Sequence, residues 1–495
     1  MTVLDSRTVA QQTLADSVYG VFVDNAYRPS VTGKTFDVTN PATGDLLATI
    51  PDAGADDTRA AIDAAAAALP GWSAVPALQR SDMMRKAAAL MVERKERLAT
   101  VMTLEQGKPL TEARGEIVYA ASFLTWFAGE AERVYGQIVP ATVPNKRLMV
   151  LRQPVGVVAL ITPWNFPSAM LTRKLGPALA AGCTAICKPA EQTPLSALEL
   201  GRIFIDAGFP PGVVNILPAS DPIPFSDVIF ADDRVRKVSF TGSTEVGKIL
   251  IRNSAATVKR ISLELGGNAP FIVFDDADLD AAVKGAIASK FRNNGQTCVC
   301  ANRIYVQRGI YDRFAARFAE DVGKMKVGNG LLPDSVLGPL IDMAARMKVE
   351  KHISDALSHG ANLLLGGSAM PDDANTSGTF WQPTVLTNVG SDMLITQEET
   401  FGPVAPLIPF DTEDEVIAAA NNTPFGLAAY FYTRDVSRVM RVAERLEYGI
   451  IGANDALPST ANAPFGGVKQ SGLGREGGSV GIDEYLEVKY LSLGL

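Results

Sequence analysis

Short apolar runs alternate with helical segments between residues 155 and 263, and this alternation constrains the fold more than any other feature. The runs are rich in β-branched residues and cover residues 155–161, 184–187, 213–217, 235–240 and 260–263. Segments between them have helical periodicity, as at Leu200, Ile203, Phe204 and Ala207. Strands that alternate with helices favour a parallel sheet covered by helices on both faces. A second series begins near Phe271 and continues to about Phe431, so we predict an α/β protein.

The segments outside these series have patterns of their own. Helices are expected over residues 56–70, 77–105 and 111–134, and residues 1–16 form a short polar tail. Residues 483–495 alternate like a strand, and a chain end of this form often pairs with a neighbouring subunit. A chain of 495 residues exceeds what one hydrophobic core usually serves, so two or more domains are expected.

Charge and apolar patterning exclude several classes of partner. The 46 basic and 54 acidic residues give a net charge of −8, which provides no footprint for nucleic acid or an anionic membrane surface. No apolar run approaches the ~18–20 residues that span a bilayer, and the N-terminus lacks the apolar core of a secretory signal. Four cysteines are too few for a disulfide scaffold, so we expect a cytoplasmic protein.

The two histidines exclude further chemistry. His352 lies on the apolar face of a predicted helix and is expected to be packed, and His359 precedes the helix-ending Gly360. Neither is expected to be catalytic, and no metal site is expected, because the cysteine spacings are not those of zinc sites.

Two glycine-rich segments are candidate phosphate loops. Residues 472–477 match Gly-x-Gly-x-x-Gly but follow no predicted strand, so we interpret them as a turn. Residues 242–248 follow a strand and open a helix, whose N-terminal amides suit a phosphate. Ile249 stands where a P-loop has its Mg²⁺-binding hydroxyl, which favours a dinucleotide pyrophosphate over a hydrolysed nucleotide. An ordinary capped turn remains an equal alternative on this motif alone.

A loop cysteine and a strand-end carboxylate are the candidate reactive groups. Cys298 and Cys300 lie in a polar loop, residues 291–300, where a thiol is more exposed than in a core. Glu264 closes a strand and precedes a Gly-Gly turn, at the position where doubly wound sheets bind ligands. On position alone, a structural cysteine and a solvated glutamate remain open.

Six motifs together resemble the aldehyde dehydrogenase superfamily from about Val21 to the C-terminus. They are Pro163-Trp164-Asn165-Phe166-Pro167, Lys188-Pro189-Ala190-Glu191, Phe240-Thr241-Gly242-Ser243-Thr244, Glu264-Leu265-Gly266-Gly267, Gly295-Gln296-Thr297-Cys298 and Glu399-Thr400-Phe401-Gly402-Pro403. The segments 291–300 and 464–477 resemble the succinate-semialdehyde dehydrogenase branch in particular. The resemblance implies a Rossmann-like NAD-binding domain (17–135 and 155–265), an α/β catalytic domain (266–470) and a β oligomerisation arm (136–154 and 482–495) that forms a homodimer or homotetramer.

The resemblance also implies a mechanism. Cys298 would attack the aldehyde, Asn165 and the Cys298 amide would hold the oxyanion, and Glu264 would activate the water that hydrolyses the thioester. Lys174 would support the charge balance. A CoA-dependent acylating enzyme and a non-catalytic structural protein remain alternatives.

The cofactor implied by the resemblance is NAD or NADP, with no metal. The residues implied to bind it are Thr162, Pro163, Trp164, Lys188, Glu191, Thr241, Gly242, Ser243, Gly247, Leu265, Glu399 and Phe401. Glu191 would accept from the ribose 2′-hydroxyl and repel a 2′-phosphate, so we predict NAD over NADP.

By resemblance, the substrate is a small aldehyde with a distal carboxylate. Arg173, Arg292 and Ser459 would clamp that carboxylate, beside Phe465, because arginine forks suit the planar anion. Succinate semialdehyde is the first choice. The loop 457–463 departs from the pattern of the branch, so glutarate semialdehyde or a broader aldehyde specificity stays open. A disulfide between Cys298 and Cys300 is a further hypothesis, with a packed Cys300 as its alternative.

Overall fold

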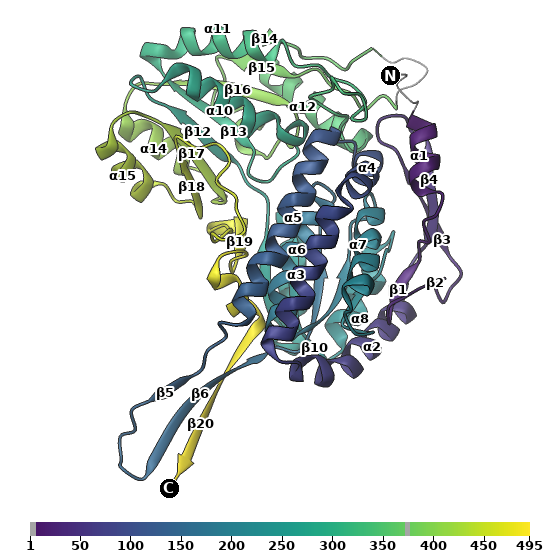
Figure 1. The fold of residues 1–495 in the computed structure, drawn as a ribbon. Coiled ribbons are helices and arrows are strands. Elements are labelled where there is room, and N and C mark those ends of the chain that lie inside the picture. Colours follow the sequence, from purple (N-terminus) through teal and green to yellow (C-terminus); the bar gives the residue numbers. More distant parts are fainter. Residues whose placement is uncertain (1–5, 372–376) are drawn as a thin grey trace.

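The computed structural model describes residues 6–371 and 377–495, which form two sheet-based units and a projecting arm (Figure 1). The first sheet has eight strands in the order β19-β11-β10-β7-β8-β9-β1-β2. Their bounds are β19 (Gly472–Leu473), β11 (Arg260–Glu264), β10 (Val235–Thr241), β7 (Val157–Ile161), β8 (Thr184–Lys188), β9 (Val214–Ile216), β1 (Val21–Val23) and β2 (Ala26–Arg28). The five central strands are parallel and match the five predicted runs, whereas β19, β1 and β2 pair antiparallel at the edges.

Alternate side chains of these strands enter two different cores. In β7, Val158 and Leu160 pack against α3 (Ala77–Glu93), α5 (Leu110–Ala131), α6 (Pro167–Ala181) and α7 (Pro194–Ala207). Val157 and Ala159 face the other side, towards α2 (Ala55–Ala74), α8 (Pro222–Ala231) and α9 (Thr244–Ser254). Since successive strand residues point to opposite faces, this division confirms the sheet covered on both sides.

Three predictions for the N-terminal part of the chain differ from the structure. The predicted stop at Pro70 is wrong, because α2 continues through it to Ala74 and Trp72 in this last turn is buried in the core. The predicted helix 77–105 is divided at Arg94 into α3 and α4 (Lys95–Gln106). The tail is more than irregular chain, since Ser6–Leu14 forms α1, which lies against α4.

The second sheet has the order β14-β15-β16-β13-β12-β17-β18 and is parallel except at β14. Its strands are β14 (Asn362–Leu365), β15 (Thr384–Thr387), β16 (Val404–Phe410), β13 (Ala301–Gln307), β12 (Ala269–Val273), β17 (Ala428–Tyr432) and β18 (Ile450–Ala453). Helices α10 (Leu279–Phe291) and α11 (Tyr311–Val322) cover one face, and α14 (Glu413–Asn421) and α15 (Val436–Arg445) cover the other. Helices α12 (Met343–Ser358) and α13 (Leu394–Gln397) enclose a smaller core beside β15.

A three-stranded arm projects away from both sheets (Figure 1). It consists of β5 (Gln137–Val139), β6 (Lys146–Pro154) and β20 (Leu486–Gly494), and β20 runs antiparallel along the whole of β6. The predicted C-terminal strand is confirmed, with its partner in the same chain. A separate hairpin pairs β3 (Thr35–Thr39) with β4 (Leu46–Pro51).

Within the described ranges, no single helix is long and apolar enough to cross a membrane. Helices α2 and α3 pass such a test only as a pair bent by 117°.

Candidate active site

A tight left-handed turn presents Cys298. After α10, Asn293, Asn294 and Gly295 have φ angles of 49°, 57° and 74°, which reverse the chain before β13 begins. A Cβ on Gly295 would lie 2.2 Å from the Gly402 carbonyl oxygen, so only glycine fits there. The residues of the loop between this turn and β13 include half-buried Cys298 and buried Cys300.

The two loop cysteines differ in their surroundings. Burial, together with the Glu399 and Glu264 carboxylates, raises the pKa of the Cys298 thiol to about 12, against the lowering effect of nearby arginines. The thiol is therefore protonated at neutral pH until a base or positive charge arrives. Contrary to the expected loop exposure, Cys300 is buried, and its Sγ donates to the Lys290 carbonyl oxygen at 3.3 Å. A disulfide with Cys298 would require Cys300 to leave this contact. The disulfide hypothesis therefore stays a prediction.

Asn165 joins the loop after β7 to the cysteine loop. Its Nδ2 donates to the Gln296 carbonyl oxygen at 3.1 Å, and Asn293 Nδ2 donates to the Asn165 carbonyl oxygen at 3.0 Å. The side-chain oxygen Oδ1 of Asn165 is buried and finds no hydrogen-bond partner among the described residues. The Asn165 amide is thus held against Gln296, which precedes Cys298 by two residues, and its role towards an oxyanion stays a prediction.

Glu264 ends β11 in a buried position. Burial, and next the neighbouring Glu476 carboxylate, raise the pKa of Glu264 well above its ordinary value, while Lys174 and Arg173 lower it. Within the described part of the chain, its Oε2 has no hydrogen-bond partner. A carboxyl group with a raised pKa is a better base for water near neutral pH.

Lys174 balances the charge of a buried carboxylate, Glu476. Its Nζ contacts Glu476 Oε1 in an ion pair, and also lies 3.1 Å from Ser239 Oγ. This pair neutralises the second buried carboxylate beside Glu264. Sequence reasoning missed Glu476, which lies in the glycine-rich turn 472–477.

The turn from β10 into α9 forms the expected cradle. Ser243 caps α9 by accepting from the Val246 amide at 3.3 Å, and Gly242 precedes it at the end of the strand. A Cβ on Gly247 would lie 2.6 Å from the Leu265 side chain, so glycine lets the helix approach the Glu264 strand end. Gly472–Leu473, in the other glycine segment, form β19 at the sheet edge. The candidate 242–248 therefore has the strand-turn-helix geometry, and the candidate 472–477 does not.

The remaining cofactor candidates surround this edge of the sheet. Lys188 Nζ pairs with Glu191 Oε2 at 3.5 Å, and the Glu191 side chain is 42% exposed. Glu399 Oε1 accepts from the Gly267 amide at 3.1 Å, and burial raises the pKa of Glu399 to about 7. Half-buried Pro163 precedes Trp164, whose ring meets that of Phe401 edge-on with centroids 5.5 Å apart.

Unpartnered polar atoms show that this edge suits a polar cofactor. Thr162 Oγ1 and Thr241 Oγ1 are buried at the ends of β7 and β10 and have no hydrogen-bond partner among the described residues. Buried polar atoms without partners are costly unless a ligand or water satisfies them. The residues present therefore fit a dinucleotide with hydroxyl and phosphate groups.

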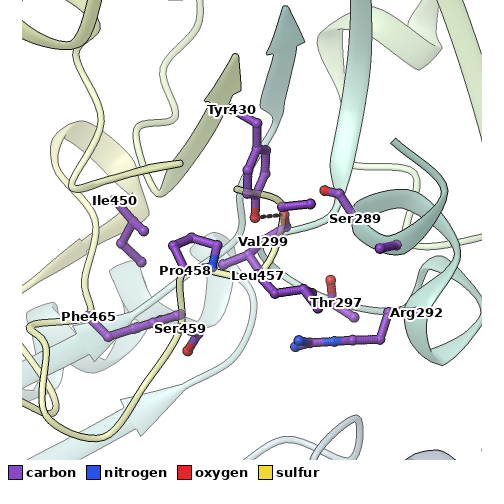
Figure 2. A pocket seen from close by; sticks show the side chains of 12 residues that line it. Ser289, Arg292, Thr297, Val299, Tyr430, Ile450, Leu457, Pro458, Ser459 and Phe465 are labelled. Atoms are coloured by element: carbon purple, nitrogen blue, oxygen red, sulfur yellow. Dashed lines mark hydrogen bonds between the residues drawn. The ribbon is translucent and has the colours of Figure 1, made fainter. Parts of the chain in front are cut away.

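A pocket adjoins Cys298, since Thr297 and Val299 on either side of the cysteine both line it (Figure 2). Its interior offers only about 10 Å³ to the centre of a water-sized sphere, within about 310 Å³ of space between atoms that includes open solvent. The other lining residues are Ala288, Ser289, Arg292, Tyr430, Ile450, Ala456, Leu457, Pro458, Ser459 and Phe465. In Figure 2, the Arg292 guanidinium extends towards the side of the pocket that carries Ser459. Leu457 and Pro458 form part of the wall, so the loop 457–463, whose sequence departs from the pattern of the branch, does reach the pocket.

Arg173 occupies a different position from Arg292. Its side chain is 1% exposed and lies behind Ser459 and Phe465, and its Nη2 lies 3.3 Å from Ser459 Oγ. The guanidinium carbon is 3.9 Å from the centroid of the Phe465 ring. Three of the four predicted substrate residues thus line the pocket, and the fourth supports it from behind.

The two histidines lie where the sequence predicts. His352 is buried in α12 with ring nitrogens 3.2 Å from Thr400 Oγ1 and Glu398 Oε2, and burial lowers its pKa. His359 is exposed at the helix end, with Nδ1 2.8 Å from the Asp355 carbonyl oxygen. In the part of the chain that the structure describes, no three His, Cys, Asp or Glu side chains are grouped to hold a metal ion.

Comparisons with known proteins agree with this geometry. The sequence model of the aldehyde dehydrogenase family matches residues 27–491. The succinate-semialdehyde dehydrogenase (NADP(+)) GabD of Escherichia coli strain K12 is 55% identical over 495 residues, 100% of both chains. A glutarate-semialdehyde dehydrogenase of Pseudomonas putida is 55% identical and covers 95% of this chain and 97% of its own.

A solved structure shows the same fold. The aldehyde dehydrogenase from Brucella melitensis biovar abortus 2308 superposes with a TM-score of 0.94 at 56% identity, over 96% of this chain and 97% of that one. The match of the family model over residues 27–491, together with a relative 55% identical over the full length, shows that this chain belongs to the aldehyde dehydrogenase family.

Proposed function

We propose that the protein oxidises a semialdehyde with a distal carboxylate, with succinate semialdehyde as first choice, to the dicarboxylic acid with NAD. The observation that carries this proposal is the pocket beside Cys298, which has Arg292 and Ser459 on its wall and the Arg173 charge behind them. Two arginines supply local positive charge in a chain of net charge −8. Among relatives, the E. coli and P. putida proteins are named for succinate and glutarate semialdehyde.

Cys298 acts as the nucleophile in this proposal. Once its thiol proton has passed to solvent water, the sulfur attacks the aldehyde carbon and the carbonyl oxygen becomes an oxyanion. The Asn165 Nδ2 donates to that oxygen together with the Cys298 amide, which stabilises the thiohemiacetal. NAD held at the turn between β10 and α9, by Gly242, Ser243 and Gly247, would supply the hydride acceptor that is needed to convert the thiohemiacetal on Cys298 into a thioester.

Glu264 completes the cycle as the base for hydrolysis. Its raised pKa suits it to take a proton from water, which then attacks the thioester carbon and releases the acid and the Cys298 thiol. The pair of Lys174 with Glu476 keeps a second negative charge from accumulating beside it. Transfer of the acyl group to CoA is the alternative, and free acid as the product would exclude it.

The cofactor preference rests on Glu191. Its carboxylate, paired with Lys188 at 3.5 Å, would accept from a ribose 2′-hydroxyl and repel a 2′-phosphate. The name of the E. coli relative carries NADP(+), so the activities of this protein with NAD and with NADP need a direct comparison. We expect a higher kcat/KM with NAD than with NADP, and a smaller ratio in Glu191→Gln. Equal or better use of NADP by the wild type would refute this preference.

A substrate panel tests the proposed activity. NADH absorbance is followed with succinate semialdehyde, glutarate semialdehyde, butanal and pentanal, and we expect a lower KM for the two anionic aldehydes. One methylene is worth only ~1–3 kcal/mol in a pocket, so the panel decides between the two semialdehydes. Arg292→Gln should raise KM for the anionic aldehydes alone. Equal KM values for charged and neutral aldehydes would refute the distal-carboxylate proposal, and no NADH at all would favour a structural protein.

The arm is proposed to mediate assembly into a homodimer or homotetramer. Ile138, Val488, Tyr490 and Leu493 are exposed on it, with 81% of Ile138 accessible in the isolated chain. Apolar side chains exposed together on a projecting sheet are typical of an interface. Light scattering should give a multiple of 52.6 kDa, and Tyr490→Lys should lower it. A wild-type mass of one chain would refute the assembly.

A further inference from the structure

Three side chains from distant parts of the chain close a hydrogen-bonded triangle behind the pocket wall. Tyr119 on α5 and Ser459 in the loop after β18 are 340 positions apart, yet their oxygens lie 2.5 Å apart. Arg173 on α6 brings its Nη2 to within 2.6 Å of the Tyr119 oxygen and 3.3 Å of the Ser459 oxygen. The sequence motifs single out Arg173 and Ser459 but not Tyr119.

Only one corner of this triangle reaches the pocket. Ser459 lines the wall beside Phe465, whereas Arg173 lies behind it with 1% of its side chain exposed. The guanidinium packs against the rings of Phe465 and Phe123, at 3.9 and 5.1 Å. The Tyr119 ring packs edge-on against Phe123, with centroids 4.9 Å apart. Arg173 Nε also lies 3.7 Å from Glu476 Oε2, so its charge is paired with a carboxylate, and its contacts with the two hydroxyl oxygens serve to orient them.

The protons in the triangle can be counted. A guanidinium only donates, so both hydroxyl oxygens accept from Arg173. The bond between the two hydroxyls uses one hydroxyl proton and leaves the other free. Either hydroxyl can be the donor in this geometry, and we take Tyr119 as the donor because a phenol is a stronger acid than an alkyl alcohol. With Tyr119 as the donor, both lone pairs of Ser459 are occupied, so its free proton can only donate towards a ligand in the pocket.

We propose that Tyr119 is a positioning residue that fixes Ser459 as a donor, so that the pocket selects aldehydes whose distal group is an anion. Arg292, on the pocket wall, supplies a second donor to the same group. A distal group that can only donate, such as an ammonium, meets no acceptor at this serine. This inference deepens the proposed function and rests on it, because it explains how the distal carboxylate is recognised.

The experiment compares succinate semialdehyde with butanal, which has the same four-carbon chain without the charge, in wild type, Tyr119→Phe, Ser459→Ala and the double variant. In Tyr119→Phe we expect KM for the semialdehyde to rise about tenfold. Its kcat at saturation, and kcat/KM for butanal, should stay within about twofold of wild type. In the Ser459→Ala background the tyrosine change should add less than about twofold, because Tyr119 acts through the serine.

Tyr311→Phe is the matched control. It removes a half-buried phenol hydroxyl that donates to the Leu407 carbonyl oxygen at 3.2 Å, away from the pocket. This substitution should leave KM and kcat/KM unchanged for both succinate semialdehyde and butanal. An equal loss for both aldehydes in Tyr119→Phe, an unchanged KM, or a full effect in the Ser459→Ala background would each overturn the inference. A wild type that does not prefer the semialdehyde to butanal would instead refute the proposed function, and the inference with it.

Discussion

Lys108 and Glu116 form an ion pair with only 1% of each side chain exposed, and its removal is the sharpest test of how the site is held. Lys108 Nζ lies 2.6 Å from Glu116 Oε2 and 2.7 Å from the Asn165 carbonyl oxygen, and 4.0 Å from the centroid of the Phe166 ring. Glu116 Oε1 accepts from the amides of Ser168 and Ala169 in the first turn of α6. The pair therefore holds both Asn165, the proposed oxyanion donor, and the first turn of α6.

Lys108→Met leaves the Glu116 carboxylate buried without its cation. Loss of one partner from a buried pair costs about 3–5 kcal/mol. Since Glu116 keeps two amide donors at a helix N-terminus, we expect a cost at the low end, about 3 kcal/mol. Lys108→Met with Glu116→Gln removes both charges, so the double variant should be more stable than the sum of the single costs by about 1 kcal/mol or more.

Urea unfolding measures the change, and hydrogen exchange of the peptide 162–181 locates it. Exchange is needed because a chain of 495 residues does not have to unfold in one step. Lys324→Met is the control, since that lysine pairs at the surface with 61% of its side chain exposed and its loss should cost far less stability than Lys108→Met. A Lys108→Met cost below about 1 kcal/mol, or single costs that simply add in the double variant, would refute the reasoning.

Three further predictions concern the chemistry and the packing. Glu264→Gln should give a burst of about one NADH per site and then a steady rate lower by about 10²–10⁴-fold, seen in stopped-flow absorbance; an unchanged steady rate would contradict its role as base. Because burial raises the pKa of Glu264, kcat of the wild type should fall as the pH drops through that raised value, above the ordinary carboxyl pKa of about 4.3, and a profile flat down to pH 5 would contradict the assignment. Gly285→Ala places a Cβ 2.0 Å from the Tyr432 hydroxyl, so it should lower stability by about 1–3 kcal/mol in thermal unfolding, whereas Gly71→Ala, with no atom within 4 Å, should not.

Local patterns predicted the strands and turns well. The five runs between residues 155 and 263 form the five parallel strands. They could be predicted because a strand buried on both faces is apolar along its whole length, which is a local pattern. Helix ends were less predictable. Pro70 is tolerated within α2 because burial of Trp72 holds the last turn against the core, which a local rule for proline does not include.

The residues that the sequence missed share one property. Glu116 lies on the apolar face of α5 with Ala113, Ala120, Phe123 and Phe127, and a charge on such a face was a usable signal of a buried pair. Tyr119 and Glu476 gave no comparable signal. Their partners, Ser459 and Lys174, are hundreds of positions away.

The sequence by itself predicted the chemical groups of the site and the local units that carry them: a cysteine in a polar loop, a glutamate at a strand end and a glycine-rich turn before a helix. Tertiary structure alone decided which charges became partners. It placed Arg173 behind Ser459 instead of on the pocket wall, and Glu476 beside Glu264. The physical reason is that burial and ion pairing depend on which surfaces meet across the whole chain, whereas periodicity and turn chemistry depend only on near neighbours.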